Sequence, residues 1–240
     1  MKAAELTEAL EGLQKAVYTV QDIARITGKG PAYLNVYLHR LKTRGVLEEV
    51  ERGTYALNYT DPMLIASGLL FPSYLSFMSG LRFYNLTTQL PRTVLVACAT
   101  SKKEIRKQTY GIQFVRLKKS RLFGYTRERM YGNKVAVVGE LEKVIVDSLL
   151  LPQYCPIDET FGALVDGKPN TERLVQYALR MDSTVLLKRL GYLLERAGTD
   201  VYGRLKGRLS RRYDRLNPFL PPGKKRERRW KLMINQELEE

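Results

Sequence analysis

The chain has 240 residues, of which 44% are hydrophobic and 10% aromatic, so it has enough apolar material for packed cores and is not a disordered protein. Its 40 Lys and Arg against 25 Asp and Glu give a formal net charge of +15, which favours a polyanionic partner such as nucleic acid. With one histidine and two widely separated cysteines, the chain has almost no material for a His-Cys metal site or a His-based triad. We therefore expect no metal, no cofactor and no catalytic residue, and we interpret Cys98 and Cys155 as buried thiols.

The N-terminal 20 residues predict an amphipathic helix. Leu6, Leu10 and Leu13 recur at helical spacing and alternate with charged residues, unlike the unbroken apolar core of a signal peptide. The longest apolar stretches, such as residues 63–71, are much shorter than the roughly 20 residues of a membrane span. We expect a cytoplasmic protein with no membrane partner.

Residues 1–60 predict a winged helix-turn-helix. A short helix at 21–27 is followed by a glycine turn and by a helix that begins at Pro31, a residue suited to the first helical position. Gly45 can end this helix in a left-handed cap, and residues 46–57 predict a β-hairpin. The order helix, helix, turn, helix, hairpin is typical of a fold that places its third helix in a major groove.

The third helix suggests a set of DNA contacts. If Leu34, Leu38 and Leu41 face the core, the opposite side carries polar and cationic residues for base edges and phosphates, and Lys42 also flanks that side. The candidate DNA-binding residues are Lys29, Tyr33, Val36, His39, Arg40, Thr43, Arg44 and Arg52. The alternative is that such a domain serves protein pairing, with these charges merely solvated.

Residues 61–240 predict a larger α+β domain, with a small β-sheet surrounded by helices. Asn58–Asp61 is a polar linker, and Pro72 and Ser73 open a helix that extends to Phe83. Strands are expected at 93–99, 112–117, 122–125 and 134–138, and helices at 139–151, 171–181, 183–198 and about 200–216.

The last 40 residues form a basic tail with interleaved aromatic residues. Such a strip could follow phosphates and stack on bases of DNA or RNA; alternatively it is a solvated basic helix whose aromatic residues face inward. The residues that define this second candidate surface are Arg204, Arg208, Arg211, Arg212, Lys224, Lys225 and Arg228. Tyr202, Tyr213 and Trp230 are the interleaved aromatic residues.

An acidic pair at Glu142 and Asp147 could suggest a nuclease or acid–base site. The chain offers no further carboxylate motif, glycine-rich phosphate loop or usable histidine beside it. We therefore favour a structural helix in which these acids cap or pair with Lys and Arg neighbours.

Several segments in a fixed order resemble the AbiEi-type antitoxin family. They are Pro72–Ser76 with Ser79–Leu81, Leu86–Thr87 and Leu90–Pro91, then Gly139–Lys143 leading to Asp147, Arg189–Leu194, and Arg229–Trp230 with Asn235. Leu141 stands where proline is commoner in the family, and Ser148 where leucine is usual. The resemblance spans nearly the whole chain, the N-terminal winged helix included.

The resemblance implies the antitoxin of a type IV toxin–antitoxin operon, countering a nucleotidyltransferase toxin without forming a stable complex with it. It also implies that the winged helix represses its own promoter at inverted repeats. Paired half-sites require two copies on the DNA, so we expect a monomer or a dimer in solution. Two alternatives are an interaction protein that neutralises a toxin by direct binding and an enzyme that acts on nucleic acid.

Overall fold

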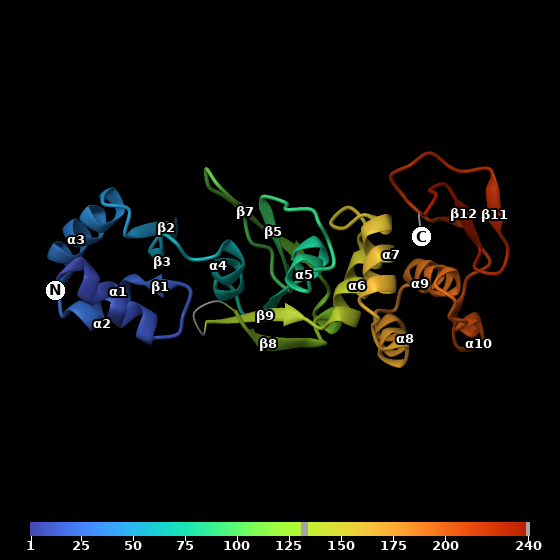
Figure 1. Cartoon of the computed structure of the whole chain (residues 1–240), viewed down its shortest axis with the longest axis horizontal. Coiled ribbons are helices and arrows are strands. Elements are labelled where there is room, and N and C mark those ends of the chain that lie inside the picture. The colour runs from blue at the N-terminus through green and yellow to red at the C-terminus, as the bar shows by residue number, and fades with distance from the viewer. Residues whose placement is uncertain (131–133, 239–240) are drawn as a thin grey trace. The chain divides into compact units, whose positions relative to one another are not determined.

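The computed structural model describes residues 1–130 and 134–238. It is an α+β fold whose described residues form helices and three β-sheets (Figure 1). The chain divides into two compact units, each assembled from separate stretches. The first comprises Met1–Leu75, Arg92–Val115 and Arg127–Val138, and the second comprises Ser76–Pro91, Arg116–Thr126 and Gly139–Glu240.

The first unit begins with three helices and a three-stranded sheet. The elements are α1 (Ala3–Gly12), β1 (Tyr18–Thr19), α2 (Val20–Thr27), α3 (Pro31–Thr43), β2 (Leu47–Glu51) and β3 (Thr54–Leu57). Thr19 caps α2, because its hydroxyl accepts from the Asp22 N–H and the Asp22 carboxylate accepts from the Thr19 N–H. The strands β2 and β3 are antiparallel, and β1 pairs with β3 on its other edge.

A six-stranded sheet follows, in the order β6-β7-β5-β4-β9-β8. Its strands are β4 (Ser73–Leu75), β5 (Thr93–Cys98), β6 (Ile105–Arg106), β7 (Gly111–Arg116), β8 (Tyr125–Arg129) and β9 (Val135–Gly139). Leu75 is central, because it pairs with Val96 of antiparallel β5 and with Val138 of parallel β9. The helix α4 (Pro62–Gly68) packs on β4 and β5, which explains why β5 is an almost continuous buried apolar run.

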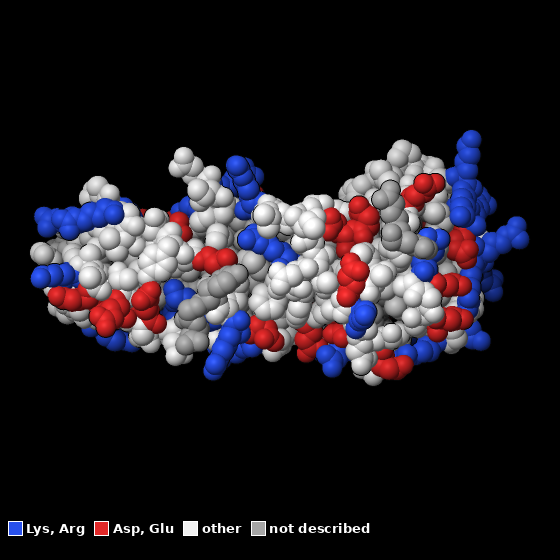
Figure 2. Space-filling view, viewed as in Figure 1, with Lys and Arg blue, Asp and Glu red and all other residues white. Residues whose placement is uncertain are grey.

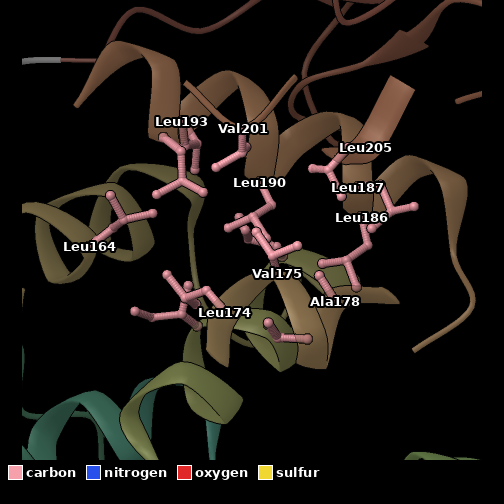
Figure 3. Close-up of a cluster of buried hydrophobic side chains, with 14 of the residues drawn as sticks. Leu164, Leu174, Val175, Ala178, Leu186, Leu187, Leu190, Leu193, Val201 and Leu205 are labelled. Carbon is pink, nitrogen blue, oxygen red and sulfur yellow. The ribbon is translucent and has the colours of Figure 1, made fainter. Parts of the chain in front are cut away.

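The second unit is a bundle of helices. They are α5 (Phe77–Phe83), α6 (Leu141–Leu150), α7 (Ile157–Asp166), α8 (Thr171–Arg180), α9 (Thr184–Arg196) and α10 (Tyr202–Leu205), with 3-10 turns at Lys119–Arg121 and Lys206–Arg208. α6 contacts α5, α7, α8 and α9, so it forms the centre of the bundle (Figure 1). Figure 3 shows leucine and valine side chains of α7, α8 and α9 converging with Val201 and Leu205 in one apolar cluster.

A small sheet completes the second unit, in the order β10-β12-β11. Its strands are β10 (Asp214–Arg215), β11 (Lys225–Glu227) and β12 (Leu232–Ile234). Two buried cations of α9 attach it: the Lys188 ammonium lies 2.6 Å from the Asp214 carboxylate, and the Arg189 guanidinium donates to the Leu216 carbonyl at 2.9 Å. Burial lowers the pKa of Arg189 to about 10.

The expected basic helix over residues 200–216 is wrong. The helix α10 ends at Leu205, and the chain then forms the 3-10 turn Lys206–Arg208 and strand β10. A continuous helix would place like charges four residues apart, as at Arg204 and Arg208, which destabilises a helix. The observed path instead lets Lys188 bind three groups, the Ser210 hydroxyl, the Arg212 carbonyl and the Asp214 carboxylate.

Two other expectations need correction. The helix expected from Pro72 to Phe83 is divided, because Ser73–Leu75 pairs between β5 and β9 and the helix begins only at Phe77. The strand expected at 122–125 lies at Tyr125–Arg129, since Gly124 has a φ of +64° and interrupts the extended backbone. The helix Ile157–Asp166 was not predicted from the sequence pattern.

Candidate nucleic-acid interface

The helix α3 presents one buried and one exposed face, as its sequence predicts. Leu34, Leu38 and Leu41 are each 2% exposed and pack in one core with residues of α1, α2 and the hairpin. Pro31 occupies the start of the helix, and Gly45 follows its end with a φ of +68°. These three leucines fix the rotation of the helix about its axis, and hence which residues face outward.

The predicted contact residues on α3 are all on the exposed side. Tyr33 and Val36 are 53% and 48% exposed, so both side chains are accessible to a ligand. The other exposed candidates are His39, Arg40, Thr43 and Arg44, together with Arg52 in the turn between β2 and β3. The Thr43 hydroxyl donates to the His39 carbonyl at 3.1 Å, which leaves its oxygen free to accept from a ligand.

Lys29 and two tyrosines form a small cluster at the start of α3. The Lys29 ammonium lies 4.1 Å from the centre of the Tyr33 ring and 5.1 Å from that of Tyr37. The two rings are stacked, with their centres 6.5 Å apart. Tyr37 was not among the predicted contacts, although its spacing of four residues from Tyr33 places the two on one helix side. The cluster holds a cation beside the exposed face.

Lys42, which flanks the exposed side of α3, forms an ion pair with Glu49. Its ammonium lies 2.6 Å from the Glu49 carboxylate, and that hydrogen bond raises the pKa of Lys42 and lowers the pKa of Glu49. Glu49 also accepts from the Gly53 N–H, so the pair joins α3 to the hairpin turn. A phosphate contact by Lys42 stays a prediction, with which this ion pair would compete.

The other carboxylates of β2 also have partners within the first unit. Glu48 accepts from the Tyr110 hydroxyl at 2.8 Å, and Glu51 lies 2.8 Å from the Lys102 ammonium. The Lys107 ammonium donates to the Glu49 carbonyl. These contacts tie β2 to residues 102–110 and reduce the negative field beside the hairpin.

The N-terminal segment carries little of the positive surplus. Residues 1–60 contain eight Lys and Arg against seven Asp and Glu, whereas the whole chain has a net charge of +15. The face shown in Figure 2 accordingly presents both basic and acidic side chains on this segment. Any DNA contact here must therefore depend on the shape and chemistry of α3 more than on net charge.

A comparison with protein families gives a match over this segment. Residues 13–58 match the family described as "Transcriptional regulator, AbiEi antitoxin". The AbiEi resemblance is confirmed for residues 13–58. This AbiEi segment runs from the end of α1 to the residue after β3, and so contains the whole of α3 and the hairpin.

The whole chain is also similar to a solved structure. It superposes on the crystal structure of the RV2827C protein from Mycobacterium tuberculosis with a TM-score of 0.69 and 17% sequence identity. The match covers 96% of this chain and 90% of that one, so the two proteins share a fold over almost their full lengths. No curated protein matches the sequence. None of the helices in the described residues has the length and apolarity needed to cross a membrane.

Outside the AbiEi segment, the acidic pair of α6 has structural partners. Asp147 is fully buried, accepts from the buried Lys143 ammonium and accepts from the Ser76 hydroxyl at 2.9 Å. Glu142 accepts from the Asn170 N–H at 2.8 Å, at the residue that caps α8. The two carboxylates therefore join α6 to its neighbours, as the structural interpretation predicts.

The structure separates the basic residues of the tail into two groups. Arg204 pairs with Glu172 at 2.6 Å, and Arg229 pairs with Glu195 and Asp200. Trp230 is fully buried against α9, so it cannot stack on a base, and the inward interpretation holds for this residue. Other exposed cations of the tail are Lys206, Arg208, Arg211, Arg212, Arg215, Lys224, Lys225, Arg226 and Arg228.

Proposed function

We propose that residues 1–60 form a winged helix that binds duplex DNA through α3, and that the protein is a transcriptional regulator of its own operon. The observation that carries this proposal is the match of residues 13–58 to AbiEi transcriptional regulators, over the segment in which α3 exposes Tyr33, Val36 and Arg40. The order of α2, a glycine turn, α3 and a hairpin supports it.

The exposed side chains of α3 suit a major groove. Arg40 can donate two hydrogen bonds to a guanine edge, and Val36 can contact a thymine methyl group. Tyr33 and Thr43 offer hydroxyls for phosphates or base edges, and His39 lies on the same side of the helix. Lys29, Arg44 and Arg52 lie at the helix ends and in the hairpin turn, where they would bind backbone phosphates.

The proposal extends to an operator and a toxin. Two copies of α3 on inverted half-sites about one helical turn apart would cover an operator in the protein's own promoter. Repression there would limit expression of a neighbouring nucleotidyltransferase toxin, and the second unit would supply the antitoxin activity in the cytoplasm. Neither role requires a stable complex between the two proteins.

The test is a binding titration of the full chain against its own upstream DNA and against a scrambled duplex of equal length, at two salt concentrations. Specific binding should be tighter by a factor that persists at the higher salt, because base contacts release fewer counterions than phosphate contacts. Equal and steeply salt-dependent binding to both duplexes would refute the repressor function. Rescue of growth when the chain is co-expressed with the adjacent toxin tests the antitoxin role separately.

A further inference from the structure

Most of the net positive charge lies at the C-terminal end of the chain, not in the AbiEi segment. Residues 203–236 contain twelve Lys and Arg against only two acidic residues, Asp214 and Glu227. Figure 2 shows Lys and Arg side chains gathered at this end of the second unit. The DNA contacts proposed for α3 do not account for this excess of Lys and Arg, because it lies in another part of the chain.

The small sheet places Arg215 and Arg226 on one face. Residues that pair directly across strands point to the same side, so Arg215 of β10, Met233 of β12 and Arg226 of β11 share one face. Asp214, Leu232 and Glu227 share the other. Leu232 is buried in the core, which makes this second face the inner one.

Both acidic residues have partners near the inner face. Asp214 pairs with the buried Lys188 ammonium, and Glu227 accepts from the Arg229 N–H at 2.7 Å. Lys225 pairs with Ile234 and so lies on the inner side, whereas Arg215 and Arg226 lie on the outer one. The outer face is therefore cationic, with no acidic residue of 203–236 on it.

An aromatic ring lies among these cations. The Arg226 guanidinium is 5.5 Å from the centre of the Tyr213 ring, and the Lys231 ammonium is 5.6 Å from it. Tyr213 is partly exposed, and the loop between β10 and β11 adds Phe219, which is 63% exposed. Cations held beside a partly exposed ring on a sheet can bind phosphates while the ring stacks on a base.

We propose that this outer face, defined by Tyr213, Arg215, Arg226 and Lys231, binds single-stranded nucleic acid. The bases of a single strand are free to stack on Tyr213, whereas those of a duplex are already stacked on one another. The cations of this face can contact successive phosphates of one strand. This binding is independent of the duplex contacts proposed for α3.

The test uses the full chain and a fluorescently labelled RNA single strand of about 12 nucleotides, within the usual site size for such surfaces. Tyr213→Ala should weaken binding about tenfold, and Tyr213→Phe should restore it, because the ring and not the hydroxyl stacks. The double variant Arg226→Ala/Lys231→Ala should also weaken binding and reduce its salt dependence. Lys103→Ala/Arg106→Ala, two exposed cations of the first unit, removes the same charge and should leave binding unchanged.

Two results would overturn the proposal that the outer face binds single strands. Unchanged single-strand binding in Tyr213→Ala and in the double cation variant would overturn the proposal. Loss of upstream-duplex binding in these variants, with no loss for the single strand, would assign the face to DNA flanking the operator and would also overturn it. Unchanged far-UV circular dichroism in each variant excludes unfolding as the cause. An Arg40→Ala variant that keeps single-strand binding would separate this face from α3.

Discussion

The indole ring of Trp230 packs directly on Gly191 of α9. A Cβ atom built on Gly191 would lie 2.0 Å from Cζ3 of Trp230, much closer than any real contact. The Trp230 N–H donates to the Glu195 carboxylate one helical turn further along. This contact between α9 and Trp230, two residues before β12, anchors the C-terminal sheet on the helical bundle.

Gly191→Ala should therefore destabilise the second unit by about 1–3 kcal/mol, the usual cost of overpacking a well-filled core. Trp230 is the only tryptophan in the chain, so a urea titration followed by intrinsic fluorescence reports on this unit directly. The matched control is Gly203→Ala in α10, where a Cβ atom would meet nothing within 4 Å. Equal midpoints for the two variants would contradict this contact.

The two cysteines should be unreactive in the folded protein. Burial raises the pKa of Cys98, and it raises the pKa of Cys155 to about 11. At about pH 8 little reactive thiolate is then present, and the sulfur atoms are shielded from reagents. A colorimetric thiol assay should detect almost no thiol before denaturation and both afterwards. Rapid modification of one thiol in the native protein would contradict this prediction. The Cys98→Ala variant would then show which cysteine reacts, because it retains only Cys155.

The β2–β3 hairpin should lose stability in acid through Glu49. The hydrogen bond from Lys42 holds the pKa of Glu49 below its ordinary value of 4.5. A carboxylate with a lowered folded-state pKa stabilises the fold above the ordinary value, and this stabilisation is lost as the pH falls through the lowered one. Amide hydrogen exchange of residues 47–57 should show that acid-dependent loss of protection.

In Glu49→Gln, the same residues should be less protected at neutral pH and should depend less on pH below 4.5. Glu8→Gln, at an exposed position of α1, serves as the control and should behave as the wild type does. An identical pH profile in Glu49→Gln and wild type would mean that another carboxylate controls the acid sensitivity of the hairpin.

Arg40→Ala should weaken binding to the upstream DNA by about 1–3 kcal/mol, and more for the operator than for a scrambled duplex, if Arg40 contacts a base. Equal weakening for both duplexes would instead assign Arg40 to a phosphate. Arg106→Ala removes an exposed arginine that already pairs with Glu104, and it should change neither affinity. Unchanged operator binding in Arg40→Ala would contradict the orientation proposed for α3 on DNA.

The N-terminal elements were predictable because their determinants are local. Leucines at positions 34, 38 and 41 fix the buried side of α3, and Pro31 and Gly45 mark its ends, within 15 residues of chain. The exposure of Tyr33, Val36 and Arg40 follows from the same helical periodicity. The ion pair of Lys42 was not predicted, because its partner Glu49 comes from the following strand and periodicity carries no information about that contact.

The tail depends on contacts that are distant in sequence. Its composition already indicated a basic surface, but whether a given arginine is free or paired depends on partners such as Glu172 and Glu195. Lys188, which comes from α9, draws residues 210–214 out of a helical path into a strand. The sequence by itself therefore determined the exposed face of α3 and the excess of charge at the C-terminus. Only the tertiary structure decided which cations share an open face, because buried ion pairs and strand register depend on residues far apart in the chain.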